Sequence, residues 1–360
     1  MNNQLSIYLD GIRFFAALCV FISHVSAFMG GFLWQLGGLG HEAVVFFFVL
    51  SEYVISFVSA DKENNASEYI INRVVRIYSV ALPALILTVV LYYIGNYVNP
   101  EAFDSLNKRL INPITTIISA IFFVNQSWIG IPIFSNLPYW SLGYEVWYYV
   151  IFGVFIFMSG FKRIALVILC LIMMGLSVLL YLPIWLLGVF CYKAFQHIRI
   201  QKNVAYFLYL FSLFLIFFLC FGNTQKIINC YFHGLVGESF ISMLNEPAEK
   251  FGADYLLGVA ISMNIFSFAI IGKNLVVFNT KVGAVIKLLA SYTFSTYLYH
   301  MPILFFISAI IPFKNNPAVN IVSCLVLTPL IIVLFGNVTE KKKYACKIIM
   351  LRFVKKLGFV

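Results

Sequence analysis

Three ionisable residues, Asp10, Arg13 and His24, stand inside the first apolar stretch, LDGIRFFAALCVFISH at residues 9–24. Ionisable groups are costly inside a membrane and almost always face the protein interior or a hydrated cavity, so they mark functional sites. Arg13 and His24 are eleven residues apart, which in an α-helix leaves them about 20° apart around the axis and about 16 Å apart along it. One helix face therefore carries a guanidinium near one membrane surface and an imidazole near the other.

Asp10 precedes Arg13 by three residues, so the two side chains are helical neighbours and are expected to pair. A signal-anchor helix with a few satisfied polar groups is the alternative interpretation. The first twelve residues contain no Lys and no Arg, and no cleavage site of small residues is evident. We therefore expect residues 7–28 to remain as the first span rather than to be removed as a signal peptide.

The composition is that of a polytopic helical membrane protein. Hydrophobic residues make up 62% of the chain and charged residues only 11%, against roughly 25% charged residues in soluble domains. The formal net charge of +10 is therefore attributed to cytoplasmic loops rather than to nucleic-acid binding. None of the seven cysteines forms a Cys-x-x-Cys pair, so we expect neither a disulfide framework nor a metal site.

About ten segments are apolar enough to cross a hydrocarbon core of about 30 Å. They are residues 7–28, 41–59, 78–97, 140–159, 163–181, 183–195, 203–222, 254–272, 289–311 and 318–336. Pro183 predicts a tight turn between the fifth and sixth of these spans. An eleventh apolar run, 110–127, is interrupted by polar residues and Pro113.

The distribution of Lys and Arg decides whether residues 110–127 cross the membrane. If they do not cross and the N-terminus is cytoplasmic, most Lys and Arg residues lie inside, as the positive-inside rule requires; if they cross, most lie outside. We therefore predict an all-α bundle of ten spans with both termini cytoplasmic and residues 128–139 outside. The transmembrane domain covers residues 1–340, and residues 341–360 form a basic cytoplasmic tail. His41 and Glu42 fall at an outer boundary and are expected to be solvated.

Two polar residues fall at matched depth in this topology. His24 lies roughly 6 Å below the outer surface and Glu145 roughly 7 Å below it, so they meet if their helices pack together. A carboxylate beside an imidazole orients the ring for general-base chemistry. Ser51, Glu52 and His300 fall nearer the middle of the membrane, where each alone is explained by polar contacts between helices. Together the buried ionisable residues indicate either a catalytic cavity or a transport pathway.

Five ordered blocks of the sequence resemble the acyltransferase-3 family of integral membrane acyltransferases. The blocks are LDGIRFFAALCVFISH (9–24), FFFVLSEYVIS (46–56), RVVRIYSVALPAL (73–85), LPYWSLGYEVWYY (137–149) and SYTFSTYLYHMPILFF (291–306). They resemble the family's Arg-x10-His, FFxLSG, RxxRIxP, WSLxxE and SxxxYLxH patterns. The resemblance extends from residue 9 to about residue 306.

The resemblance implies a multi-pass protein of the bacterial inner membrane that transfers an acyl group, usually acetyl, from cytoplasmic acyl-CoA to a hydroxyl of a cell-surface glycan. Such glycans include O-antigen, exopolysaccharide and lipid-linked oligosaccharide. Acetyl-CoA is then a co-substrate, and no bound cofactor is implied. The family's Arg-x10-His pair corresponds to Arg13 and His24, its RxxR to Arg73 and Arg76, and its glutamate to Glu145.

By this resemblance Arg13, Arg73 and Arg76 bind acyl-CoA. The CoA phosphates lie at Arg73 and Arg76, the thioester arm follows the helix face of Arg13, and the acyl carbon lies near His24. His24, held by Glu145, either removes the proton of the acceptor hydroxyl or is itself acylated first. Supporting residues are Asp10, Ser51, Glu52, Trp140, Ser141 and His300. Glu52 replaces the family's glycine, and Ser79 replaces its proline. The rival interpretation is a transporter or proton-coupled permease whose buried charges bind a polar solute or relay protons.

Overall fold

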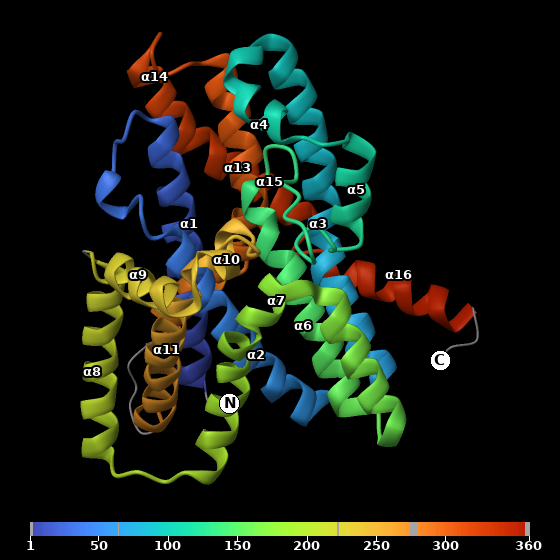
Figure 1. The fold of residues 1–360 in the computed structure, drawn as a ribbon, viewed down its shortest axis with the longest axis vertical. Coiled ribbons are helices and arrows are strands. Elements are labelled where there is room, and N and C mark those ends of the chain that lie inside the picture. The colour runs from blue at the N-terminus through green and yellow to red at the C-terminus, as the bar shows by residue number, and fades with distance from the viewer. Residues whose placement is uncertain (1–2, 64, 222, 274–279, 357–360) are drawn as a thin grey trace. The chain divides into compact units, whose positions relative to one another are not determined.

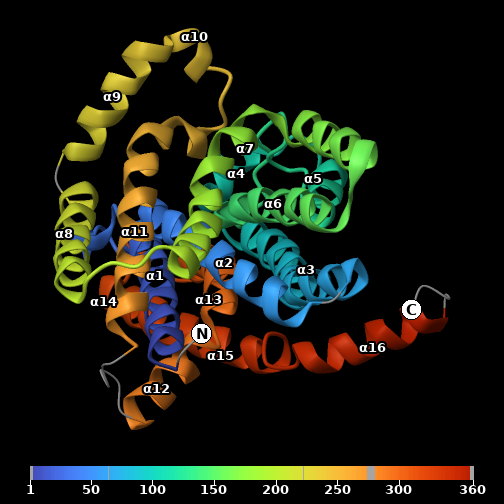
Figure 2. The ribbon, with the colours of Figure 1, turned by 90° about the horizontal axis from the view of Figure 1, so that it is seen from below.

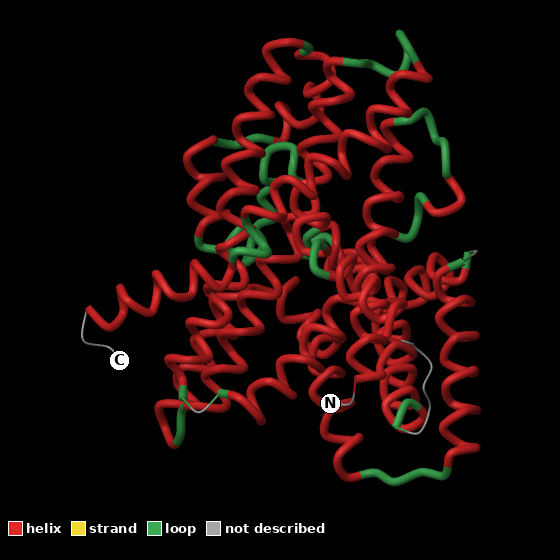
Figure 3. Tube along the Cα trace, turned by 180° about the vertical axis from the view of Figure 1, so that it is seen from behind, coloured by secondary structure: helices red, strands yellow, loops and turns green. Residues whose placement is uncertain are grey.

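The computed structural model describes residues 3–63, 65–221, 223–273 and 280–356. The structure is 83% helical, and the described residues contain no β-strand. Figure 3 shows the helices and the loops that join them. Within these ranges, nine helices are long and apolar enough to cross a membrane. The predicted all-α transmembrane fold is therefore confirmed. Residues 357–360 of the predicted tail lie outside the described residues.

Sixteen α-helices follow one another along the described chain (Figure 1). They are α1 (Asn3–Phe28), α2 (Gly40–Lys62), α3 (Ala66–Val98), α4 (Asp104–Arg109), α5 (Pro113–Ile121), α6 (Trp140–Phe157), α7 (Gly160–His197), α8 (Lys202–Cys220), α9 (Thr224–Val236), α10 (Glu238–Ile241), α11 (Phe251–Ile271), α12 (Thr280–Ala290), α13 (Thr293–Ile310), α14 (Pro317–Val322), α15 (Thr328–Val338) and α16 (Lys343–Lys356). A π-helical turn, Ser323–Leu327, joins α14 to α15.

Contacts within the chain divide it into two compact units. Unit 1 comprises residues 1–16, 41–63 and 175–290, and unit 2 comprises residues 17–40, 64–174 and 291–360. Helices α1 and α7 contribute residues to both units, and α2 does so through Gly40, its first residue.

The fifth and sixth predicted spans both fall within α7, and the structure corrects the boundary between them. Gly175 has φ 78° and ψ 168°, which is not helical, whereas Pro183 lies inside the helical part that follows. Glycine suits this position because it adopts positive φ without the steric cost of a Cβ. A straight helix of 38 residues would be about 57 Å long, nearly twice the thickness of the hydrocarbon core. The predicted turn at Pro183 is therefore wrong, and the break is at Gly175.

We expect this break to reverse the chain, so that α7 supplies two crossings and brings the total to ten. Cysteines placed at the exposed positions Lys162 and Gln201 should then react with an impermeant maleimide only after permeabilisation. A cysteine at Ile129, which is 68% exposed, should react in intact spheroplasts. The cysteine-free variant is the control. Labelling at Gln201 from outside, with Lys162 protected, would mean that α7 crosses once and that the chain has nine spans.

Close packing in unit 1 depends on glycines. A Cβ built on Gly188 of α7 would lie 2.5 Å from the carbonyl oxygen of Val49 and 2.7 Å from the amide nitrogen of Tyr53, both in α2. A Cβ on Gly258 of α11 would lie 3.0 Å from Leu187 Cδ1. Small residues that let helices approach closely are typical of membrane helix interfaces. They bring α2, the second piece of α7 and α11 together, while α8 lies beside α11 (Figures 1 and 2).

In unit 2, a buried asparagine holds α13 at its proline. Pro302 has no N–H to donate to the carbonyl of Leu298, four residues earlier. The side-chain Nδ2 of Asn136 donates to that carbonyl instead, at 2.9 Å, and also lies 3.2 Å from Thr88 Oγ1 of α3. Asn136 is fully buried. The loop before α6 therefore fixes α13 against α3 without leaving the carbonyl unsatisfied.

The interrupted run 110–127 forms only one short helix. Asn112 accepts hydrogen bonds from the amides of Ile114 and Thr115 and so caps α5, whose nine residues begin with Pro113. Nine helical residues span about 13 Å, less than half of the hydrocarbon core. The helical part of the run is thus too short to cross, as the sequence predicts. The sidedness of the loop that follows stays a prediction.

Candidate active site

Two histidines from different helices meet in unit 2. His24 lies in the part of α1 that belongs to this unit, and His300 lies in α13. His24 Nδ1 is 2.9 Å from His300 Nε2, and the two rings stack with centroids 5.1 Å apart. His300 is fully buried, whereas His24 is partly exposed. The sequence places His300 nearer the middle of the membrane than His24, and the structure brings the two rings into contact.

The partners of the two rings fix where their protons lie. His300 Nδ1 is 2.8 Å from the carbonyl oxygen of Thr296, and a carbonyl can only accept, so this nitrogen carries the N–H. In a neutral imidazole the other nitrogen is then an acceptor. His300 Nε2 must therefore receive the N–H of His24 Nδ1. In the neutral pair this leaves the lone pair on His24 Nε2, which is the atom of a general base.

Gly40, the first residue of α2, lies close to this nitrogen. A Cβ built on Gly40 would lie 4.0 Å from His24 Nε2 and 2.8 Å from Ser23 Oγ. Ser23 Oγ in turn donates to the carbonyl of Gly37 at 2.5 Å. A larger residue at position 40 would collide with Ser23 and crowd the basic nitrogen, so glycine keeps this side of the ring open.

Two further contacts hold α13 in place beside His300. Tyr297, one turn earlier, donates from its hydroxyl to the carbonyl of Pro138 at 2.8 Å, and its oxygen lies 2.7 Å from Ser141 Oγ. At the start of α13, the carboxylate of Glu340 accepts from the amide of Ser295 at 2.9 Å and from its hydroxyl at 2.8 Å. This satisfies a donor that a helix start otherwise leaves without a partner. Sequence reasoning identified Ser141 but missed Tyr297 and Glu340.

Glu145 does not hold His24. Its Oε1 lies 3.8 Å from Arg76 Nη2 and accepts a hydrogen bond from the hydroxyl of Tyr149. His24 instead makes its side-chain hydrogen bond with His300. The predicted pairing of His24 with Glu145 is therefore wrong: equal depth fixes position along the membrane normal but not the side of the helix.

The two arginines of the RxxR pattern lie in α3, also in unit 2. Arg73 is buried, with its guanidinium carbon 4.3 Å from the centroid of the Tyr69 ring. Arg76 is more accessible, with 40% of its side chain exposed beside Glu145. From the same α6 segment as Glu145, Trp140 packs its ring edge-to-face on Tyr144 at 5.2 Å.

Four predicted site residues belong to unit 1. Arg13 pairs with Asp10 at 3.5 Å, as expected from their spacing. In α2, Ser51 is buried and Glu52 is fully buried. Ser56, one turn after Glu52, donates from its hydroxyl to Glu52 Oε1 at 2.9 Å. The carboxylate at the family's glycine position thus has a hydroxyl donor within its own helix.

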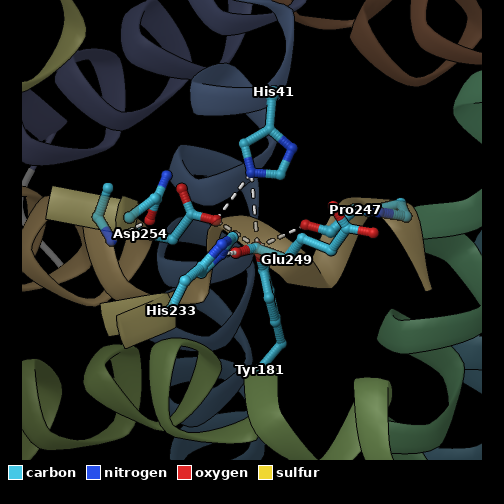
Figure 4. A network of polar contacts seen from close by, with 8 residues as sticks. His41, Tyr181, His233, Pro247, Glu249 and Asp254 are labelled. Carbon is cyan, nitrogen blue, oxygen red and sulfur yellow. Dashed lines mark hydrogen bonds and ion pairs between the residues drawn. The ribbon is translucent and has the colours of Figure 1, made fainter. Parts of the chain in front are cut away.

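A second polar network in unit 1 overturns the expectation that His41 and Glu42 are solvated (Figure 4). His41 Nε2 lies 2.7 Å from Asp254 Oδ2, and Asp254 is fully buried. The single O–H of Tyr181 points between two acceptors, Asp254 Oδ2 and the carbonyl of Pro247, so the two share it. Glu42 is only 4% exposed. Sequence reasoning missed this network because Asp254 looks like an ordinary acidic residue in the first turn of a helix, where carboxylates are favoured.

Among the described residues, no group of three or more His, Cys, Asp and Glu side chains is arranged to hold a metal ion. The chemistry available in unit 2 is that of a base and cations: a histidine pair with one basic nitrogen, and two arginines with a nearby carboxylate. Buried ionisable groups of this kind are typical of multi-helix membrane proteins that bind polar or charged ligands.

A family model described as an acyltransferase domain matches residues 6–336. The match covers nearly the whole chain, so the chain belongs to the acyltransferase-3 family and is a membrane acyltransferase. The resemblance of the five sequence blocks is thereby confirmed. No curated protein and no solved structure gave a significant match to the chain.

Proposed function

We propose that this protein transfers an acyl group, most simply acetyl, from acyl-CoA to a hydroxyl of a cell-surface glycan in the bacterial cytoplasmic membrane. One observation carries the proposal: the chain of contacts from the Thr296 carbonyl through His300 to His24, which leaves His24 Nε2 as a base. Acyl transfer to a hydroxyl needs such a base, because the hydroxyl must lose its proton as its oxygen attacks the thioester.

In the proposed step, His24 Nε2 accepts the proton of the acceptor hydroxyl while the hydroxyl oxygen bonds to the thioester carbon. The tetrahedral intermediate then expels the CoA sulfur, and the bond between carbon and sulfur breaks. The imidazolium returns its proton to the thiolate, which leaves as free CoA, and His24 is neutral again. An acyl-His24 intermediate, formed by attack of Nε2 on the thioester, is the alternative route to the same products.

Arg73 and Arg76 are the proposed anchors of the CoA phosphates. Guanidinium groups form charge-assisted hydrogen bonds to phosphate oxygens, and Arg76 is accessible for this with 40% of its side chain exposed. In the structure the Glu145 carboxylate lies 3.8 Å from Arg76 Nη2 and partly neutralises its charge. The role of Glu145 is then to hold Arg76 in place, together with Tyr149, rather than to orient the base.

Replacing Arg76 by Gln should raise the KM for acetyl-CoA by about ten-fold or more, since a hydrogen bond to a charged group contributes about 1.5–3 kcal/mol. Arg73→Gln should act in the same direction, with an added loss of stability because Arg73 packs on the Tyr69 ring. Initial rates in membrane vesicles at varied acetyl-CoA measure both effects. Lys108→Gln is a matched control, because Lys108 is exposed and pairs with Asp104 in α4. Unchanged KM values in both arginine variants would assign these residues to membrane topology alone.

The direct test of the proposed function is incubation of membranes containing the protein with radiolabelled acetyl-CoA and glycan acceptors. Label is expected to appear in the glycan only when the protein is present, and to be removed by mild base, which cleaves O-acetyl esters. Transport of a polar solute without any dependence on CoA would instead support the rival class.

A further inference from the structure

The C-terminal helix α16 places a cation beside the arginine-bearing part of α3. Figures 1 and 2 show α16 running past the N-terminal part of α3. Lys347 Nζ donates to Asn72 Oδ1 at 2.6 Å, and Asn72 directly precedes Arg73. Both helices belong to unit 2. A residue from the basic tail thus reaches the segment that carries the two arginines.

The positions of Asn72 and Arg76 put Lys347 and Arg76 on the same side of α3. Residues four apart in a helix are about 40° apart around the axis and about 6 Å apart along it. Asn72, which holds the Lys347 ammonium, and Arg76 therefore lie about one turn apart on one face of α3. Two cations at this spacing suit a ligand with two separate phosphate groups, because each phosphate then meets its own cation.

The charge of Lys347 is not neutralised by its partner. The Asn72 side chain is a neutral amide, and an ammonium has three N–H donors, of which this contact uses one. In the described part of the chain, no carboxylate pairs with Lys347, which is half-buried. By contrast, Arg76 has the Glu145 carboxylate beside it. Lys347 thus has charge and donors left for an anion.

We infer that Lys347 of α16 completes a phosphate-binding site with Arg76 and Arg73, and that this site takes the phosphates of acyl-CoA. The inference rests on the proposed function and adds to it: the basic tail is part of the donor-binding site. The 3′-phosphate and the diphosphate of CoA are separate anionic groups, as the paired cations require. Anionic lipid headgroups present the same phosphate chemistry, so the two sources must be distinguished by experiment.

The test compares two acetyl donors in nanodiscs. Acetyl-CoA carries the phosphates, and acetyl-pantetheine carries the same thioester arm without the 3′-phosphate and the diphosphate. In discs of phosphatidylcholine alone, Lys347→Gln should raise the KM for acetyl-CoA by about ten-fold and leave the KM for acetyl-pantetheine unchanged. Lys347→Arg should restore the KM for acetyl-CoA. Arg352→Gln, which removes an exposed charge from the same helix, should change neither constant.

Three results would overturn the inference. Equal loss with both donors would mean that Lys347 only supports the fold through Asn72. No change with either donor would mean that Lys347 does not bind the donor. A defect that appears only in discs containing phosphatidylglycerol, and equally for both donors, would assign Lys347 to lipid headgroups.

A binding measurement separates this inference from the proposed function. Adenosine 3′,5′-bisphosphate carries two of the phosphate groups of CoA and no thioester, so its binding needs no acyl transfer. Wild-type protein should bind it, and Lys347→Gln should weaken that binding by about ten-fold. If the wild type binds it and transfers no acyl group, the phosphate site stands and the proposed reaction fails. If the wild type transfers acetyl and Lys347→Gln binds the bisphosphate normally, this inference fails alone.

Discussion

Replacing His24 by Asn should reduce acyl transfer by about 10³-fold, within the range of about 10²–10⁴ that a positioned acid–base group contributes. The amide nitrogen of Asn corresponds in position to Nδ1 of His, so it can still donate to His300 Nε2, which accepts from His24 Nδ1 at 2.9 Å in the native protein. Nothing in Asn replaces the lone pair of Nε2. The variant therefore removes the base while retaining the contact that ties α1 to α13.

His24→Ala is the harsher variant, because it also leaves the buried Nε2 of His300 without its donor, at a cost of about 1–3 kcal/mol. We expect both variants to insert into the membrane, with Ala less stable to heat in detergent than Asn. Rates of label transfer from radiolabelled acetyl-CoA, normalised to the amount of folded protein, provide the measurement. A His24→Asn protein with a near-normal rate would remove His24 from the reaction.

Much of the fold could be predicted because membrane insertion leaves a strong signal in composition. Hydrophobic length located nearly all of the spanning helices, and the interrupted run before residue 128 was correctly expected not to cross as a helix. The boundary inside α7 was missed because Pro183 looks like a breaker, whereas the nonhelical residue is Gly175. Proline is tolerated in membrane helices, and from sequence alone a glycine within an apolar run does not reveal a positive φ.

The sequence predicted several residues of the candidate site but not which of them contact one another. His24, Arg76, Glu145 and His300 stand out because each is ionisable within an apolar helix. Counting residues along a span gives depth, and it led to the pairing of His24 with Glu145. Which faces of two helices meet depends on tertiary packing. Here Asn136 donates to the Leu298 carbonyl of α13, and Tyr297 of α13 donates to the Pro138 carbonyl. That information is not present in the spacing of a single helix.

Packing also explains why the network at His41 was missed. The sequence shows His41 at the start of an apolar span and Asp254 at the start of another, 213 residues later. Each alone resembles a solvated residue at a membrane boundary. The glycines at positions 188 and 258 allow their helices to approach. His41 and Tyr181 then both contact Asp254 Oδ2 in the interior of unit 1.

The second large loss of activity is expected for substitutions of His300. Two substitutions distinguish a role in orienting His24 from a role in accepting a proton. Its Nε2 accepts from His24 Nδ1, which fixes the tautomer that leaves the lone pair on His24 Nε2. His300→Phe removes the acceptor, so His24 is free to adopt the other tautomer. In a serine protease, the wrong tautomer of the catalytic histidine lowers kcat by about 10⁴-fold. We expect a loss of about 10²-fold or more for His300→Phe, in kcat rather than in the KM for acetyl-CoA.

His300→Gln should retain most of the activity, because the side-chain oxygen of Gln corresponds in position to Nε2 of His and can still accept from His24 Nδ1. Gln cannot take up a proton, so this variant also tests whether the positive charge of the reacting pair must be shared between the two rings. A rate for His300→Gln within about ten-fold of the wild type means that His300 orients its neighbour. A loss as large as that of His300→Phe means that the proton moves on to His300 during the reaction. Normal activity in both variants would show that the contact between the two histidines has no part in acyl transfer.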